Sequence, residues 1–333
     1  MKKLRFGMLF AAAAVAIAVL CGGVAQAEEY YTEESGGAAA AAPAPEKGPP
    51  LPFHSIEGVG GGAITPMAYL VNPPAEGHCW GKPAVAFSYV NLGRKNLDAL
   101  TITENYAGRI EFGYAAERFG LGTFPADIRT ATAGLGPGGQ GIDIDHSDVW
   151  LHNFNVRVLL LKENYCDTSL PAVTAGFHFK YNDGIRDINN RLGGLLSDIG
   201  YARENSIDYT LTATKTLPTA FFCRPLIVTA GLRESQAANL GLLGFGEKYR
   251  ATFEGNVAVL PVDNILVAYE FRQKSSPYGQ IPGLIGDEDN WHAIDVSLIM
   301  SKHATLVAGY GIFGTLANSE ADSAWWLQLK YEF

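Results

Sequence analysis

The last nine residues of the chain, WWLQLKYEF (residues 325–333), decide the fold. Large apolar side chains stand at every second position, namely Trp325, Leu327, Leu329, Tyr331 and Phe333. The positions between them from Gln328 onward are polar, with Lys330 and Glu332 following. Successive side chains of a β-strand point to opposite faces, so this alternation predicts a strand with one apolar and one polar side.

The same period of two recurs upstream, from residue 83 onward. Val85, Phe87 and Tyr89, for example, alternate with Ala86 and Ser88. We expect twelve such strands, at residues 83–91, 98–104, 108–116, 149–161, 172–181, 206–215, 226–233, 249–260, 263–273, 291–301, 304–313 and 324–333. Repeated amphipathic strands without helical periodicity place the chain in the all-β class.

Two architectures use such strands: a soluble β-sandwich and a transmembrane barrel. Strands of about ten residues suit a tilted bilayer span. Aromatic residues recur near strand ends, as an interfacial girdle requires, and the polar faces carry both signs of charge, which suits a wet lumen. We therefore predict a transmembrane antiparallel up-and-down β-barrel of about 12 strands, with 14 as the alternative.

The connections between strands alternate in length. Bacterial barrels have short periplasmic turns and longer outer loops. With the carboxy-terminus in the periplasm, every long connection falls outside, including 117–148, 182–205, 234–248 and 274–290. This agreement supports an even strand number.

The first 52 residues precede the barrel. Lys2, Lys3 and Arg5 lead into the apolar run 6–20 and then Ala25-Gln26-Ala27, a pattern typical of a secretory signal peptide over residues 1–27. Residues 28–52 are rich in alanine and proline, and we expect a disordered linker there.

Residues 53–82 are too apolar and too rich in glycine for a linker. They fit a plug in the barrel mouth or a periplasmic segment, while a further strand at 64–71 is the alternative. The barrel itself is expected to occupy residues 83–333.

Composition excludes one class of partner. The 333 residues carry a formal net charge of -9, whereas nucleic-acid binding needs a dense basic surface. Only 18% of the residues are charged, which is low for a soluble protein and is explained by strands with a lipid-facing side. We expect no nucleic-acid partner.

The polar strand faces assign a set of charged residues to the lumen. Charge rings of this kind tune permeation, although opposite charges on adjacent strands can also pair and seal the interior. The near balance of sign predicts weak ion selectivity for an open pore. The lumen-lining candidates are Arg109, Glu111, Arg157, His178, Lys180, Asp208, Arg233, Arg250, Glu254, Glu270, Arg272 and Asp295.

Motifs for catalysis or cofactor binding are weak. The glycine run 58–62 does not open a helix after a strand, as a dinucleotide site requires. Residues 143–148 cluster three carboxylates with His146, and we favour a solvated acidic loop over a calcium site. We expect no cofactor, no metal and no enzymatic activity.

The alternating pattern that ends on Phe333 resembles the carboxy-terminal signal of Gram-negative outer-membrane β-barrel proteins. The resemblance implies a location in the outer membrane, contact with its lipid, and recognition of Trp325, Leu327, Leu329, Tyr331 and Phe333 by the barrel-assembly machinery. The stretch EGVGGGAITPMAYL (residues 57–70) also resembles the opening of a bacterial family of unknown function, which brings no known activity.

Three functions remain from the sequence. The first is a porin-like channel for the passive passage of small hydrophilic solutes. The second is a non-conducting barrel that serves as a structural or partner-binding protein. The third, an outer-membrane hydrolase, has the weakest support, because no nucleophile and base are spaced for a relay.

Overall fold

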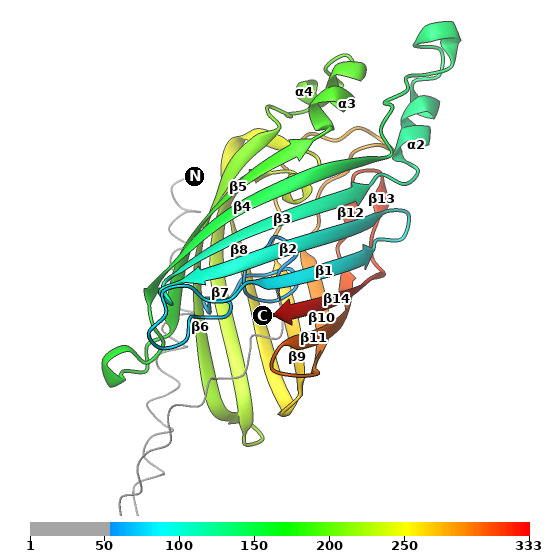
Figure 1. The fold of residues 1–333 in the computed structure, drawn as a ribbon. Coiled ribbons are helices and arrows are strands. Elements are labelled where there is room, and N and C mark those ends of the chain that lie inside the picture. The colour runs from blue at the N-terminus through cyan, green and yellow to red at the C-terminus, as the bar shows by residue number, and fades with distance from the viewer. Residues whose placement is uncertain (1–53) are drawn as a thin grey trace, which may run out of the picture.

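The computed structural model describes residues 54–333, so the predicted signal peptide and linker lie outside the described residues. Twelve strands form one closed antiparallel barrel in which neighbours in the chain pair and β1 closes the sheet against β14 (Figure 1). This confirms the predicted up-and-down barrel and its strand number. The strands are β1 (Ala84–Asn91), β2 (Asn96–Tyr106), β3 (Ile110–Gly120), β4 (Asp148–Leu161), β5 (Ala172–Asp183), β6 (Asn205–Phe221), β7 (Arg224–Ala237), β8 (Phe245–Val262), β9 (Ile265–Arg272), β10 (Trp291–Ile299), β11 (Ala304–Ile312) and β14 (Ala324–Glu332).

The two ends of the barrel differ in their connections. One end, here the loop end, carries the helices α2 (Phe124–Ala131), α3 (Ile185–Arg191) and α4 (Leu195–Asp198) and the small hairpin of β12 (Thr315–Leu316) and β13 (Ser319–Glu320) (Figure 1). The opposite end, the turn end, has the connections β2–β3, β4–β5, β6–β7, β8–β9 and β10–β11. Short 3₁₀ turns lie at Pro137–Gly139, Tyr165–Asp167 and Asn239–Gly241.

The barrel strands turn large apolar side chains outward, while most of the buried charged and polar side chains, together with some apolar ones, face inward. On β10, Ile294 is 55% exposed whereas the adjacent Asp295 is fully buried. On β2, Leu100 is 59% exposed and Thr101 is 1% exposed. A continuous apolar outer surface over a polar interior is the arrangement of a barrel that faces lipid. Within residues 54–333, helices of the length and apolarity needed to cross a membrane are absent.

Aromatic side chains gather on the outer face near strand ends. His152 on β4 makes stacked ring contacts with Tyr114, Trp150 and Tyr181, and its Nδ1 lies 2.8 Å from the Tyr114 hydroxyl. Trp291 is an exception to the expected girdle. It shares the inward face with Asp295 and is buried at 4% exposure, packed against Phe313.

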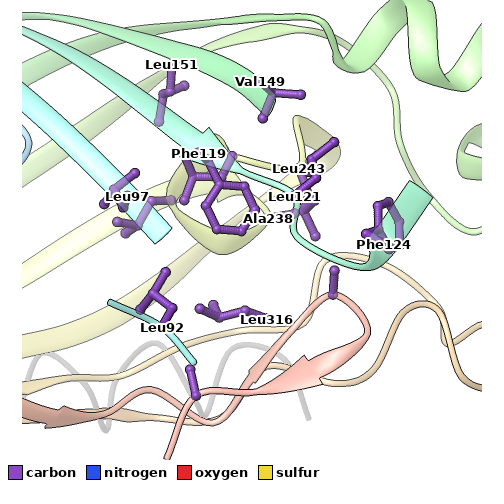
Figure 2. Packing of buried hydrophobic residues seen from close by; sticks show 14 of the residues in the cluster. Leu92, Leu97, Phe119, Leu121, Phe124, Val149, Leu151, Ala238, Leu243 and Leu316 are labelled. Atoms are coloured by element: carbon purple, nitrogen blue, oxygen red, sulfur yellow. The ribbon is translucent and has the colours of Figure 1, made fainter. Parts of the chain in front are cut away.

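The loop end is closed by an apolar cluster, here the apolar cap. Large apolar side chains from the strand ends and from the loops are buried together there, as Figure 2 shows for Leu92, Leu97, Phe119, Leu243 and Leu316. Ile56, Ala63 and Ile64, which precede the barrel in the chain, belong to the same cluster. The cap therefore joins the loops to a stretch of chain that lies inside the barrel.

Candidate functional site

Residues 54–71, here the inserted segment, lie within the barrel among the inward-facing side chains. Every residue of this segment except Tyr69 is buried. Two antiparallel bridges, His54 with Gly60 and Gly61 with Pro66, fold it back on itself. The segment adds no strand to the barrel, so the alternative of 14 strands does not apply.

Glu270 on β9 holds the middle of the inserted segment. Its carboxylate accepts hydrogen bonds from the backbone N–H groups of Ala63 (2.7 Å), Ile64 (3.2 Å) and Thr65 (2.8 Å). The Thr65 hydroxyl donates to the same carboxylate. Successive N–H groups around one carboxylate form a nest, and such charge-assisted bonds are stronger than neutral ones.

Glu111 on β3 and Arg157 on the neighbouring strand β4 bind two further parts of the inserted segment. Glu111 accepts from the N–H groups of Gly60 (3.1 Å) and Val71 (2.7 Å). Arg157 donates from Nε to Glu111 at 2.9 Å and from Nη1 to the carbonyl of Met67 at 2.6 Å. The pair is almost fully buried, so it depends on the segment for part of its hydrogen bonding.

Neutral polar side chains complete these contacts. Thr174 donates to the carbonyl of Ala68 at 2.7 Å, and the N–H of Ala68 donates to Thr214 at 2.8 Å. The ring of His54 lies between the hydroxyls of Thr101 and Thr103. The inner wall thus satisfies the backbone of the segment with side chains from many strands.

Glu57 lies at the centre of a buried ion network. Five consecutive strands, β5 to β9, each contribute one charged residue, and the signs alternate: Lys180, Asp208, Arg233, Glu254 and Arg272. The Glu57 carboxylate reaches all three cations, with Lys180 Nζ at 2.6 Å, Arg233 Nη2 at 3.1 Å and Arg272 Nη1 at 2.7 Å. All six side chains are at most 3% exposed, so each charge is compensated by its neighbours rather than by water.

The structure places ten of the twelve lumen candidates in the barrel interior. These are buried at 0–3% exposure: Glu111, Arg157, His178, Lys180, Asp208, Arg233, Glu254, Glu270, Arg272 and Asp295. His178 contacts Asn155 and Thr210 of the wall through its two ring nitrogens.

The prediction that Arg109 and Arg250 line the lumen is wrong, because both side chains are exposed. Arg109 is exposed because β3 starts only at Ile110, which leaves the arginine in the turn after β2. Arg250 shares the inward face of Glu254, but β9 pairs with β8 only up to Glu254. At residue 250 the strand has a partner on one side alone, and the side chain is exposed.

Glu57 was missed as a site residue. It is the only carboxylate between Phe53 and Ala75, within an otherwise apolar and glycine-rich stretch. A buried carboxylate needs cationic partners, and the predicted lumen residues include Lys180, Arg233 and Arg272. An isolated acid in an apolar stretch, next to a lumen with several predicted cations, is therefore the sequence signal that points to Glu57.

Two small cavities lie in the barrel interior. Beside the ion network, between Asp208 and Lys274, a cavity of about 20 Å³ remains, and a second of the same size lies under the apolar cap. Such a volume holds about one water molecule. A larger cavity of about 670 Å³ opens at the turn end, against Tyr69, Pro74, Cys79 and Glu163. The inserted segment and the apolar cap thus occupy the barrel interior around the ion network and at the loop end.

Gly113 on β3 marks the closest approach of the wall to the segment. A Cβ at this position would overlap the carbonyl oxygen of Gly58. We expect Gly113→Ala to displace the segment at a cost of about 1–3 kcal/mol, because overpacking is relieved more easily by the segment than by the paired strands. A cysteine placed at the buried Val59, in a chain whose other cysteines are replaced by serine, should then react roughly tenfold faster with maleimide.

Gly231→Ala is the matched control, since a Cβ on that inward-facing glycine would lie 3.4 Å from its nearest neighbours. Equal labelling rates in the two alanine variants would contradict the close contact between Gly113 and the segment.

Lys95 in the β1–β2 connection fastens the hairpin of β12 and β13 to the barrel. Its Nζ donates to Asn318 Oδ1 at 2.6 Å and to Ser319 Oγ at 2.5 Å. Burial lowers the pKa of Lys95 to about 8. The unfolded chain holds this proton up to a pKa of about 10.4, so the contribution of Lys95 to stability rises as the pH increases between these two values.

We expect an NMR titration of lysine side chains to show one midpoint at a pKa of about 8, absent in the Lys95→Gln variant. A midpoint for Lys95 at the pKa of a free lysine would contradict its burial.

The acidic loop 143–148 is held by ion pairs. Arg129 contacts Asp143 at 2.6 Å, and Arg191 contacts Asp145 at 3.2 Å. The N–H of Asp145 and, to a smaller extent, Arg129 lower the pKa of the Asp143 carboxyl. Cys79, Cys166 and Cys223 are exposed and unbridged.

The carboxy-terminal residues lie on the outer face of the last barrel strand. Trp325, Leu327, Leu329, Tyr331 and Phe333 are 42–53% exposed. Between them, Gln328 and Lys330 are buried in the lumen, and Gln328 donates to the carbonyl of His54 in the inserted segment at 2.5 Å.

Comparison with known proteins supports membership of a family without an assigned activity. Among solved structures, the chain is similar to the KdgM porin (10% identity, 75% of this chain and 99% of that chain, TM-score 0.44). It is also similar to the NanC porin (9%, 75% and 98%, TM-score 0.43) and to the outer membrane protein Omp33 of Acinetobacter baumannii (8%, 76% and 98%, TM-score 0.32). No curated protein matches the sequence significantly. The model of the family described as a protein of unknown function, DUF3034, matches residues 52–330, and the chain belongs to that family.

Proposed function

We propose that this protein is a porin-like outer-membrane channel that the inserted segment holds closed, and that it passes small hydrophilic solutes when the segment leaves the lumen. The observation that carries the proposal is the chemistry of the closure. The wall binds backbone groups of the segment through Glu270, Glu111 and Arg157, and it binds the Glu57 carboxylate through the surrounding cations. When the segment leaves the lumen, water can hydrogen-bond to these charged groups of the wall in its place.

The membrane location rests on the outer surface. The outward faces of the strands are apolar, with aromatic side chains near the strand ends, as lipid and its interface require. The outward-facing alternate residues from Trp325 to Phe333 are available to the barrel-assembly machinery during insertion.

A channel explains the polar interior better than a purely structural barrel does. Replacing a buried ion network with apolar residues of similar volume is often neutral or stabilising, so a permanently filled barrel has no need of six buried charges. A lumen that must also hold water does need them. The apolar cap contains Ile56, Ala63 and Ile64 of the same segment, so its departure weakens both closures together.

Conductance in planar bilayers tests the proposal. The refolded full-length protein should be closed most of the time in KCl, whereas a variant that lacks residues 54–71 should conduct steadily. Folding of both is checked by heat-modifiable migration in gel electrophoresis, which reports an intact barrel.

A second variant tests whether the apolar cap alone keeps the barrel closed. The loop between β7 and β8 folds into the mouth, where Lys180 and Asn182 donate to the carbonyls of Leu240 and Gly241. In this variant, residues 54–71 are deleted and residues 239–243 are replaced by a short glycine linker. If both the single deletion and this combined variant fold but do not conduct, the channel proposal is wrong. The non-conducting structural barrel would then be the better description.

A further inference from the structure

We infer that the three cations around Glu57 form a binding site for carboxylate anions, and that Glu57 occupies it as a tethered ligand. This inference rests on the proposed function and names the class of solute: small hydrophilic carboxylates.

The coordination of Glu57 is that of a built carboxylate site. Its Oε1 accepts from Lys180 at 2.6 Å, and its Oε2 accepts from Arg272 at 2.7 Å. Arg233 spans both oxygens, with Nη1 at 3.4 Å from Oε1 and Nη2 at 3.1 Å from Oε2. A guanidinium that bridges the two oxygens recognises the planar shape of a carboxylate as well as its charge.

The wall keeps this site cationic and in place after Glu57 leaves. Asp208 lies 2.9 Å from Lys180 and 3.0 Å from Arg233, and Glu254 contacts Arg233 at 3.1 Å and Arg272 at 3.5 Å. The two acids fix the orientation of the three cations but compensate only two of their charges. One positive charge and donors on Lys180, Arg233 and Arg272 are then left for an anion from solution.

This local arrangement changes the expectation of weak ion selectivity. The lumen as a whole is near charge balance because it includes Glu111 and Glu270, which bind other parts of the segment. The five charged residues on β5 to β9 alone have three cations and two acids once Glu57 has left. A carboxylate solute that reaches the ring meets the same donors as Glu57 and competes with it, so binding of the solute also favours release of the segment.

Sodium gluconate is the probe, and sorbitol, which has the same number of carbon atoms and no carboxylate, is its neutral counterpart. Isothermal titration measures binding to the full-length Glu57→Ala variant and to the variant lacking residues 54–71, both in detergent. Gluconate should bind both and sorbitol neither. Arg272→Gln in either background should weaken gluconate binding about tenfold or more, since the variant loses a charge-assisted hydrogen bond to the carboxylate. Arg118→Gln, at an exposed pair with Asp148, is the matched control.

The outcomes separate the inference from the proposed function. Gluconate binding that Arg272→Gln weakens supports the site even where the bilayer recordings stay silent, and a conducting barrel without such binding overturns the inference alone. Equal weak binding of gluconate and sorbitol, or an equal effect of Arg118→Gln, would also overturn it. Where the deletion variant does not fold, titration of the Glu57→Ala chain decides between these outcomes.

Discussion

Glu57→Gln is expected to raise the open probability of the full-length barrel by roughly 100-fold or more, because loss of one partner from a buried ion network costs about 3–5 kcal/mol. The substitution keeps the size of the side chain and removes its charge. Lys180, Arg233 and Arg272 then face one another with only Asp208 and Glu254 between them. Water that enters the lumen relieves this repulsion, and the segment must move to admit it.

Single-channel recording in KCl measures this effect directly. Glu76→Gln is the control, because Glu76 also precedes the barrel but is exposed. It removes the same charge without touching the network and should leave the open probability unchanged. If Glu57→Gln stays as closed as the parent protein while its barrel is folded, Glu57 does not hold the closed state.

Arg157→Met is expected to destabilise the folded protein by about 3–5 kcal/mol. The methionine fills similar space but leaves the buried carboxylate of Glu111 without its cation. It also removes the donors to the carbonyls of Met67 and Tyr69. The barrel and the inserted segment are therefore weakened together.

Urea titration followed by heat-modifiable migration measures the loss. Arg118→Met is the matched control: its pair with Asp148 is exposed, and exposed pairs contribute about 0–1 kcal/mol. The double variant Glu111→Gln with Arg157→Met should regain part of the stability, since it removes the unpaired charge. Additive losses in the double variant would show that the two residues do not act as a pair.

The strands were predictable because their signal is local. Alternation along β14 depends only on the geometry of a strand, and it separated the exposed Leu327 and Leu329 from the buried Gln328. The predictions for Arg109 and Arg250 are wrong because the signal is only local. Periodicity assigns a face to each residue, but whether that face is covered depends on where the neighbouring strands end.

The sequence by itself determined the class of the fold, the number of strands and ten of the twelve predicted lumen residues, because alternation and loop length are properties of neighbouring residues. Only the tertiary structure decided what those inward charges do. Glu57 is separated from Lys180 by 123 residues, from Arg233 by 176 and from Arg272 by 215, and these residues meet because residues 54–71 lie inside the barrel. Periodicity does not encode contacts over such distances, whereas burial demands them: a carboxylate removed from water is stable only where the fold supplies its cations.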